Sequence, residues 1–539
     1  MADGDGLMHT ASSRGRDLKA FVRGCLEDSD PFERFMAELP EGVELPTASI
    51  ATPRPSAAAV LSRETHNGLE ILLCHRVAEV PAFPDFWAFP GGGVSRVDRT
   101  AANAHPKWFA GRQDRVSLIT LLREMVEEIG IAPDGSGGFL EVSSDVRDAV
   151  NSDKAAWARL AAEGSLAVKR FEAEVISERT TPPLAPVRFD NRFYHVALGA
   201  SKVEPSFPSG RSEFDGFRWW KPADLLASWL AHEVRLPPPQ VTLIRDITDS
   251  GFEVLAADPP SGYHIIEFAP GVECVPLPTA TLPPATHTNC YVLGVAGGQR
   301  VIVDAAAKSP EALAILAAKV EEIEGTGSTI IATVFTHRHP DHIGDLSAIS
   351  KLYQAPIWAS AETHELIPPC DTDSNISDGD TFTLDGPAGL VTWTVLETPG
   401  HCPGHICLAS QAGIISGDNA VVVGTILVPS GEGDMNAYLD GLERLRALDS
   451  PLLFPGHGPM AANPNRLLTH YIKHRRARHA RVLAAVEEGL SDVESIAESA
   501  YRDTPQAHPM LAIDQTLSHL YALAQSGEVV TDNDIFRKA

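Results

Sequence analysis

The segment TIIATVFTHRHPDHIGD, residues 329–345, constrains the fold and chemistry of this chain more than any other. An apolar run typical of a buried strand ends in His337, His339, Asp341 and His342. Imidazole and carboxylate groups suit a borderline cation such as zinc, and a loop after a strand can aim alternate side chains at one point. A lone histidine on a strand is usually an ordinary core residue. Four ligand-type side chains within six positions instead predict a metal site.

Three later segments repeat this arrangement of a strand followed by a ligand-type side chain. Strand VTWTVLET precedes His401, AGIISGD ends in Asp418, and PLLFPGHGP carries His457. Ligands delivered from several strand ends converge at one edge of an α/β sheet. Two cations held there, about 3.5 to 4 Å apart, would share a hydroxide and bring the pKa of bound water towards about 7. The joint pattern therefore predicts a hydrolase whose nucleophile is water.

The motifs T-H-x-H-x-D-H, T-P-G-H, S-G-D and P-G-H-G, in this order, resemble the metallo-β-lactamase superfamily over roughly residues 262–465. Within it, TNCYVLG, ETPGHCPGH and GDMNAYLDGLERL are most similar to the lactamase-beta-2-like group, which includes endoribonucleases and thioesterases. The resemblance implies an αββα sandwich that binds two Zn²⁺ ions. It assigns the first ion to His337, His339 and His401. It assigns the second ion to Asp341, His342 and His457, and it makes Asp418 the bridging carboxylate.

Further roles are predicted for one of these ligands and for residues around them. Asp341 is predicted to be catalytic as well as a ligand. His405 is predicted either to help catalysis, by contacting the substrate or protonating the leaving group, or simply to bond nearby backbone. Asp304 matches the residue that orients the metal loop in relatives. The family's usual Asp-Thr-Gly reads Asp-Ala-Ala here, so the turn after Asp304 departs from the family.

A second candidate site lies in the predicted helix RVSLITLLREMVEEIGI, which follows the glycine turn FPGGGVS. Helical spacing places Glu124, Glu127 and Glu128 on one face, although such acidic triplets are usually solvated surface. R-E-x-x-E-E-x-G after a glycine turn resembles the Nudix box, over about residues 55–250. The resemblance implies an α/β/α sandwich in which the three glutamates hold Mg²⁺ or Mn²⁺ and Glu128 is catalytic. It also implies substrate contacts from the turn and the helix: Gly91, Gly92 and Arg123.

The Nudix-like box is interrupted by an insertion that contains TAANAHPKWFAGRQD, and only Asp98 stands near the place of the usual first glutamate. Insertions of this sort, together with FWAFPGG, are similar to the subgroup that contains coenzyme A diphosphatases. Two alternatives therefore remain for the Nudix-like domain, since fold does not determine function. It hydrolyses a diphosphate, or it binds a ligand without turnover.

Pattern and punctuation divide the chain into four predicted segments. Residues 1–50 are a lead-in segment, and residues 51–255 are a Nudix-like domain with inserted segments. Residues 262–465 are a metallo-β-lactamase domain. Residues 466–539 are a tail with the helix, helix, helix and hairpin order of a small winged helix. Strands alternate with helices in both large domains, which makes the chain an α/β and α+β multidomain protein. The Asn-Gly pair in ETHNGLE predicts a β-hairpin. The basic run at 473–478 can meet an anionic substrate or the acidic remainder of the chain.

Charge and composition restrict the partners. The formal net charge of -27 makes the average surface repel polyanions, so RNA is disfavoured as a partner without being excluded. No apolar stretch reaches the roughly 18 to 20 residues of a membrane helix, and the first residues lack a secretory signal. We therefore expect a cytoplasmic protein with no membrane partner. The seven cysteines are scattered and odd in number, which predicts free thiols.

Three functions remain open on this basis. The leading one is a bifunctional hydrolase, in which activated water attacks an ester, thioester or phosphodiester in the C-terminal half and the Nudix-like half cleaves a diphosphate of a nucleotide or coenzyme A derivative. The second is an endoribonuclease in which the winged tail guides single-stranded RNA. The third is a regulatory protein whose Nudix-like half binds a nucleotide without turnover.

Overall fold

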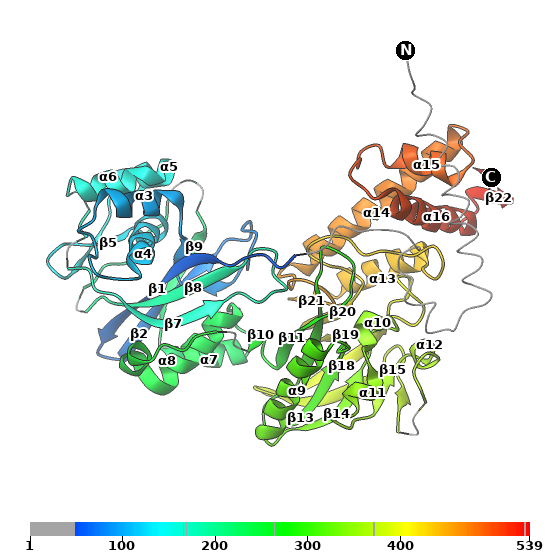
Figure 1. Ribbon diagram of the computed structural model, residues 1–539, viewed down its shortest axis with the longest axis horizontal. Helices are drawn as coiled ribbons and strands as arrows, with labels where there is room; N and C mark the ends of the chain where they lie inside the picture. Colours follow the sequence, from blue (N-terminus) through cyan, green and yellow to red (C-terminus); the bar gives the residue numbers. More distant parts are fainter. Residues whose placement is uncertain are drawn as a thin grey trace, which may run out of the picture. The chain divides into compact units, whose positions relative to one another are not determined.

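The computed structural model describes residues 49–539, apart from positions 165, 169, 200, 209, 211, 263, 264, 370, 371, 533 and 534. The predicted lead-in segment 1–50 lies outside the described residues except for its last two positions. The described chain forms two compact units, 50–274 and 275–539 (Figure 1). The sequence places the main boundary in the proline-rich and glycine-rich stretch near residue 260, and the division of the structure falls inside strand β11 (Val272–Pro278).

The first unit is built on a sheet of seven strands in the order β3-β2-β1-β8-β7, with β4 paired to β1 and β9 paired to β2. Strands β1 and β2 meet at the pair Thr65 and Gly68, which confirms the predicted hairpin at Asn-Gly. The strands are β1 (Arg54–Thr65), β2 (Gly68–Arg76), β3 (Trp87–Ala88), β4 (Gly91–Gly93), β7 (Glu174–Thr180), β8 (Phe189–Ala197) and β9 (Phe214–Trp220).

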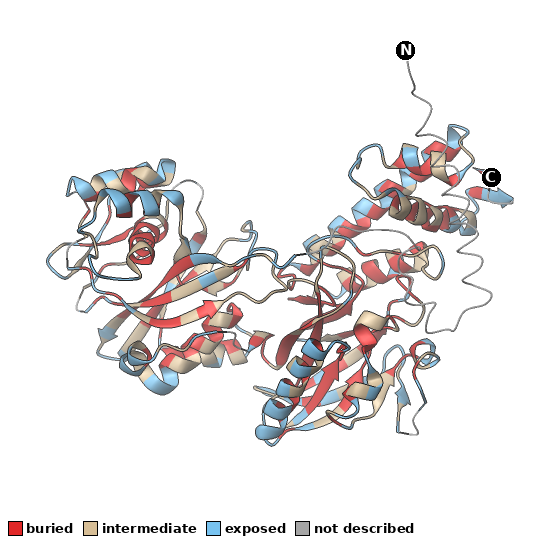
Figure 2. Cartoon of the chain, in the orientation of Figure 1, coloured by how far each residue is buried: buried red, intermediate tan, exposed pale blue. Residues whose placement is uncertain are grey.

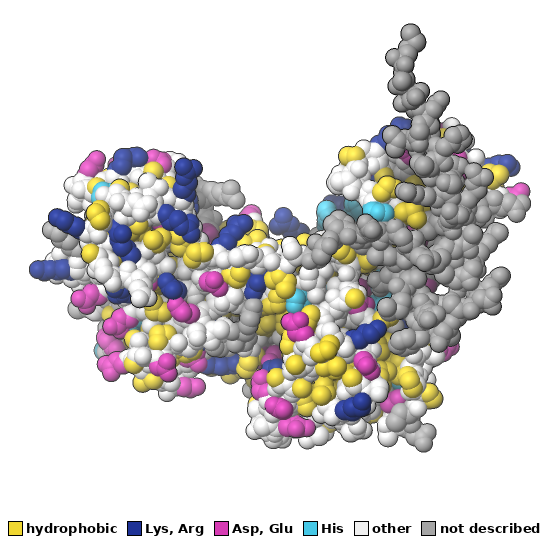
Figure 3. Space-filling model, in the orientation of Figure 1, with side chains coloured by type: hydrophobic (Ala, Val, Ile, Leu, Met, Phe, Trp, Pro, Cys, Tyr) yellow, Lys and Arg dark blue, Asp and Glu magenta, His cyan; other side chains and the backbone are white. Residues whose placement is uncertain are grey.

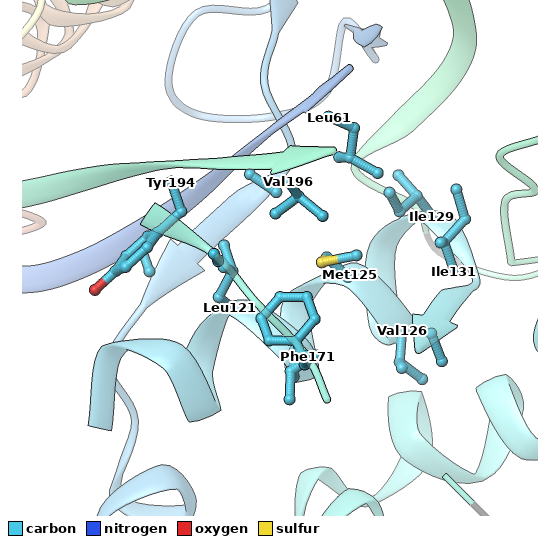
Figure 4. Packing of buried hydrophobic residues seen from close by; sticks show 14 of the residues in the cluster. Leu61, Leu121, Met125, Val126, Ile129, Ile131, Phe171, Tyr194 and Val196 are labelled. Atoms are coloured by element: carbon cyan, nitrogen blue, oxygen red, sulfur yellow. The ribbon is translucent and has the colours of Figure 1, made fainter. Parts of the chain in front are cut away.

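Helices cover both faces of this sheet, because strand side chains alternate between two cores. In β1, Ala57, Ala59 and Leu61 enter the core shared with α4 (Arg115–Ile129), whereas Ala58 and Val60 enter the core shared with α7 and α8. Figure 4 shows Leu61 and Val196 of the sheet beside Met125 of α4. The remaining elements are α3 (Arg96–Ala104), β5 (Ile131–Pro133), β6 (Phe139–Glu141), α5 (Ser144–Ser152), α6 (Lys154–Ala162), α7 (Pro222–Leu230) and α8 (Pro238–Ala257).

The second unit contains two sheets, one in which β12-β13-β14-β15-β16 follow β11 in this order and one in the order β17-β18-β19-β20-β21. Helix α9 (Pro310–Gly325) shares a core with the first sheet, and α13 (Met435–Ala447) shares a core with the second. The strands are β12 (His287–Leu293), β13 (Gln299–Val303), β14 (Thr329–Val334), β15 (Ile357–Ala359), β16 (Ser374–Asn375), β17 (Thr381–Gly386), β18 (Gly389–Glu397), β19 (Ile406–Ser410), β20 (Gly413–Gly417) and β21 (Leu453–Pro455). Strand β10 (Ile266–Ala269) lies in the first unit and pairs with the beginning of β11.

These layers follow from the hydrophobic pattern of the strands. Every residue of β12 and β20 is buried, as expected for strands covered on both faces, and the outward faces of the helices are exposed (Figure 2). The second unit therefore has the helix, sheet, sheet and helix order that the sequence predicts. Short helices α10 (Pro340–Ile343), α11 (Leu346–Ile349) and α12 (Ala361–His364) lie in its connections.

The tail begins with the long helix α14 (Pro464–Glu487), followed by α15 (Val493–Ala500), α16 (Pro509–Gln525) and a hairpin of β22 (Val529–Asp532) and β23 (Ile535–Lys538). This is the predicted order of elements, and its assignment to the winged-helix class remains a proposal. Two arginines of the basic run are buried within the protein. Arg475 donates to Gln515 at 2.9 Å, and Arg478 donates to Asp503 at 2.9 Å. No helix among the described residues combines the length and apolarity needed to cross a bilayer.

Candidate metal centre

The loop that follows β14 carries the first group of predicted ligands. His337, His339 and His342 leave the end of this strand, and none of the three is more than 1% exposed. His401, Asp418 and His457 follow β18, β20 and β21, so each comes from the end of a different strand of the second sheet. The structure brings all seven predicted ligands together. Three overlapping groups have ligand atoms within 4.8 Å of one another: His337, His339 and His401; His337, His342 and Asp418; Asp341, His342 and His457.

Three imidazoles define one side of the centre. Nδ1 of His339 lies 3.0 Å from Nε2 of His401. Nε2 of His337 is buried and has no hydrogen-bond partner among the described residues, while its Nδ1 lies 3.0 Å from the Thr336 hydroxyl. The three ring nitrogens therefore face a common point rather than ordinary partners.

Two imidazoles and two carboxylates define the other side. Nε2 of His342 lies 3.2 Å from Nε2 of His457, and the latter lies 3.4 Å from Oδ2 of Asp341. Oδ2 of Asp418 lies 3.4 Å from Nε2 of His457 and 3.9 Å from Nε2 of His401. Asp418 therefore stands between the two groups, where the sequence predicts a bridging ligand.

The donor set fits a pair of divalent cations. Two ring nitrogens at 3.0 or 3.2 Å repel each other unless a proton or a cation lies between them, and Oδ1 of Asp418 is buried without a hydrogen-bond partner in the described part of the chain. Burial and the neighbouring imidazoles hold the pKa of His337 well below its usual range. His337 is therefore neutral, which is the form that binds metal. Nitrogen and carboxylate ligands in this mixture suit Zn²⁺.

Asp304 fixes the orientation of the metal loop from behind. Its Oδ1 accepts from the Thr336 amide at 2.8 Å, and its Oδ2 accepts from the Thr336 hydroxyl at 2.8 Å and lies 2.9 Å from Nδ1 of His342. The departure from the family pattern falls in the next turn, where Ala306 has φ +46°, a conformation that favours glycine. Asp304 keeps its contacts despite that alanine.

Glu432 is a functional candidate that the sequence analysis missed. Its Oε1 lies 2.7 Å from Nε2 of His339, and its Oε2 accepts from Arg338 at 2.7 Å. Burial alone would raise the pKa of Glu432, but the hydrogen bonds and charges of His339 and Arg338 lower it to about 2. A carboxylate on the outer nitrogen fixes the tautomer of a metal-binding imidazole. Glu432 lies in a loop without a strand pattern, within the short acidic stretch GEGD, and that stretch is the signal in the sequence that could have indicated it.

Of the two roles predicted for His405, its contacts support the structural one. Its side chain is fully buried, and its Nε2 accepts from the Asp418 amide at 3.1 Å. Its Nδ1 lies 3.1 Å from the Thr398 hydroxyl and 3.0 Å from the Asn419 amide. Both ring nitrogens are thus engaged, and His405 positions the backbone of Asp418 rather than facing a substrate.

In the first unit, the predicted glutamates lie against the glycine turn but form no comparable cluster. The Gly91 amide donates to Oε2 of Glu128 at 2.7 Å, and a Cβ at Gly92 would lie 2.4 Å from Oε1 of Glu124. Glu127 instead pairs with Lys154 at 3.0 Å. None of these glutamates belongs to the groups of metal-competent side chains found in the described residues. Gly91 and Gly92 thus allow a close approach between the turn and the carboxylates of α4.

Arg123, which the sequence predicts to contact the substrate, has buried partners inside the protein. Its guanidinium is fully buried and forms two bonds to Asp98, at 2.7 and 2.9 Å. It also contacts Glu124 at 2.7 Å and Glu127 at 2.9 Å. These contacts form a structural ion pair that ties α4 to Asp98 of α3, and the substrate contact of Arg123 stays a prediction.

Comparisons with known proteins give the following. The sequence profile of the metallo-beta-lactamase superfamily matches residues 283–457. The chain is 26% identical over 250 residues to the beta-lactamase-like protein 2 homolog of Caenorhabditis elegans, covering 45% of this chain and 80% of the relative. It is 27% identical over 202 residues to the atrochrysone carboxyl ACP thioesterase of Aspergillus fumigatus, covering 37% of this chain and 60% of the relative. The crystal structure of a NUDIX hydrolase from Alicyclobacillus acidocaldarius superposes with a TM-score of 0.34 and 26% identity, covering 40% of this chain and 99% of that chain.

Proposed function

Because the C-terminal half of the chain carries a metallo-beta-lactamase superfamily domain, we propose that it hydrolyses an ester or thioester bond with two divalent metal ions, preferably Zn²⁺. The observation that carries the proposal is the meeting of seven ligand-type side chains from four strand ends at one buried point. Homology to an enzyme that its name describes as a thioesterase supports hydrolysis of an acyl bond. Water adds to the acyl carbon, and the alcohol or thiol leaves with a proton.

The residues divide this work between binding and orientation. His337, His339 and His401 would hold one cation, while Asp341, His342 and His457 would hold the other, with Asp418 shared. Bound divalent cations supply Lewis acidity, which brings the pKa of coordinated water to about 7 and stabilises negative charge on the acyl oxygen.

The remaining contacts keep these ligands in their working form. Burial would raise the pKa of Asp341, but in the metal-free protein the charge of His342 and the bond to His457 hold it far below its usual range, so Asp341 is ionised at neutral pH before a cation binds. Glu432 and Asp304 each bond the outer nitrogen of a ligand imidazole, and so orient His339 and His342. The hydroxyl of Thr281 lies 3.3 Å from Nε2 of His457, close enough to contact a bound substrate.

The charges of the chain favour an acyl bond over the phosphodiester of an endoribonuclease. RNA binding depends on clustered Lys and Arg side chains that neutralise phosphates. The formal net charge is -27, and on the face shown in Figure 3 the basic side chains of the second unit are scattered among acidic and hydrophobic ones.

The decisive experiment is removal and restoration of metal. The full chain, stripped with a chelator, is expected to lose hydrolysis of p-nitrophenyl and acyl-thioester substrates and to regain it with Zn²⁺ or Mn²⁺. Single-stranded RNA and bis(p-nitrophenyl) phosphate serve as the phosphodiester arm of the panel. Acyl hydrolysis that persists unchanged in the stripped protein would contradict the proposal, and metal-dependent cleavage of RNA alone would establish the endoribonuclease instead.

A second candidate activity is hydrolysis of a diphosphate by a Nudix-like first unit, with Mg²⁺ held by glutamates of α4. The favouring observation is the contact of Glu124 and Glu128 with the turn at Gly91 and Gly92. Backbone amides of such a turn can approach a phosphate closely, and carboxylates suit a hard cation. Without a metal these carboxylates are costly to ionise: burial raises the pKa of Glu124 to about 7, and burial with the charge of Glu124 raises that of Glu128.

This candidate predicts a pH-dependent stability of the first unit. A carboxyl whose pKa is raised in the folded state stabilises the fold while it is protonated, so stability is lost as pH rises from about 4.5 to about 7. In chelator, we expect unfolding of this unit to become easier between pH 5 and pH 8 by on the order of 2 kcal/mol, and Mg²⁺ to reverse the loss at pH 8. The Glu124→Gln variant should flatten both responses. Denaturation followed by hydrogen exchange of α4 measures this, and a Mg²⁺ effect that survives in Glu124→Gln would exclude the site.

A further inference from the structure

A groove of apolar residues opens directly onto the metal centre. Two segments of the second unit form its walls, residues 281–285 and 421–429, and its floor includes His401, Asp418 and His457. Leu282, Val421, Val423, Ile426 and Leu427 are among the residues that line it. Apart from the three residues of the centre, no Asp, Glu, Lys, Arg or His lines this groove among the described residues.

The two walls contact each other, and hydrogen bonds to the rest of the unit fix one of them. Gly424 has φ +92°, and a Cβ there would lie 3.0 Å from the ring of Pro284, so the walls meet closely at this point. Val421 is bonded through both its amide and its carbonyl to the Tyr471 hydroxyl, at 3.1 and 3.0 Å. The groove is therefore a formed part of the fold.

Arg475 contacts two residues of one wall, Thr425 and Ile426, but does not itself line the groove. Arg475 is 3% exposed and donates to the Ile426 carbonyl and to the side chains of Gln515 and Thr425. These bonds occupy its guanidinium on the rear of the wall. The lining of the groove thus contains one carboxylate and two imidazoles of the centre, and, among the residues that the structure describes, it contains no Lys or Arg side chain.

One wall also presents apolar side chains to solvent. Val422 and Val423 are 42% and 37% exposed, and of the two only Val423 lines the groove. Single exposed apolar residues are ordinary, but here one continues an apolar surface that ends at the reacting centre. Such a concave apolar site with a few convergent polar groups is typical of a small-molecule pocket.

We propose that this groove, the acyl groove, binds the apolar acyl chain of the substrate while the carbonyl lies over the centre. The inference rests on the proposed function and narrows it to esters or thioesters with an uncharged, short acyl group, because the groove has a volume of only about 40 Å³. The leaving group then points to solvent. The acyl groove adds specificity, because burial of each methylene improves binding in proportion to the apolar area removed from water.

The test measures kcat/KM of the Zn²⁺-loaded full chain for p-nitrophenyl esters from acetate to decanoate. We expect kcat/KM to rise by about threefold for each methylene until the groove is full. In Val423→Asp the value for the best-hydrolysed ester should fall by about tenfold or more, because a carboxylate would be placed against the acyl chain. The matched control is Val422→Asp, which introduces the same charge at the preceding residue, and that residue does not line the groove. It should stay within about twofold of the parent for every ester, as surface substitutions usually do.

The acetate ester separates this inference from the proposed function. Val422→Asp should hydrolyse acetate at the parental rate, and both variants should keep the parental metal content. A flat dependence on chain length, or equal losses in the two aspartate variants, would overturn the acyl groove while metal-dependent acetate hydrolysis still supports the proposed function. If the loaded protein hydrolyses no ester at any length, both proposals fall.

Discussion

Replacing His337 with alanine is expected to lower kcat/KM for ester or thioester hydrolysis by on the order of 10³-fold, since it removes a nitrogen that only a cation can satisfy at its buried position. The metal content per chain should fall in parallel. Kinetics on the purified variant, together with elemental analysis of protein prepared without chelator, measure both effects.

The control for this variant is His470→Ala, which removes the same side chain from an exposed position on α14. It should keep the parental metal content and rate. The role of His337 would be wrong if its alanine variant bound the full complement of metal and remained active. Equal losses in both variants would point to a general effect of histidine removal on the preparation.

Replacing Arg123 with alanine is expected to destabilise the first unit by about 3–5 kcal/mol, because Asp98 and Glu124 would be left buried without their partner. Asp98 and Arg123 are both fully buried, so solvent cannot compensate for the loss. Urea denaturation, read by hydrogen exchange of α4, gives the free energy of unfolding. The matched control is Arg159→Ala, whose side chain is 62% exposed in an ion pair with Asp153, and its loss should cost about 0.5 kcal/mol or less.

The same ion pair sets the sign of an acid response. Burial alone would raise the pKa of Asp98, but the hydrogen bonds and charge of Arg123 lower it below its usual range. A carboxyl with a lowered pKa stabilises the fold above its unfolded value of about 4, and that contribution is lost as pH falls below it. Arg123→Ala should therefore weaken the acid sensitivity of α4. If Arg123→Ala were as mild as Arg159→Ala, the buried pair would have no structural role.

The ligand set was accessible from sequence because each ligand follows a strand. His337, His401 and His457 come directly after apolar runs, and strand ends meet at one edge of a sheet regardless of their distance along the chain. The order of elements in the second unit followed from the same patterns. No such local rule connects Glu432 to His339, since a loop residue acquires its neighbours only when the chain is folded.

The roles of Arg123 and His405 show where sequence reasoning ends. A motif gives the identity of a residue but not its solvent exposure. The partner of Arg123 is Asp98, which the inserted segment separates from it, and burial of both decides that the arginine serves the fold. His405 stands close to the ligands in sequence, yet its two nitrogens are satisfied by Asp418, Thr398 and Asn419.

Tyr471 belongs to helix α14 of the tail, yet its hydroxyl clamps the strand-following segment at Val421. The same helix begins in the core beneath α13 and ends in the core of α15 and α16. Exchanging the tail between related chains would thus change which molecules the upstream domain accepts, even with every ligand position conserved. A change of substrate would therefore require coordinated changes in the tail and in the domain that holds the metal ligands.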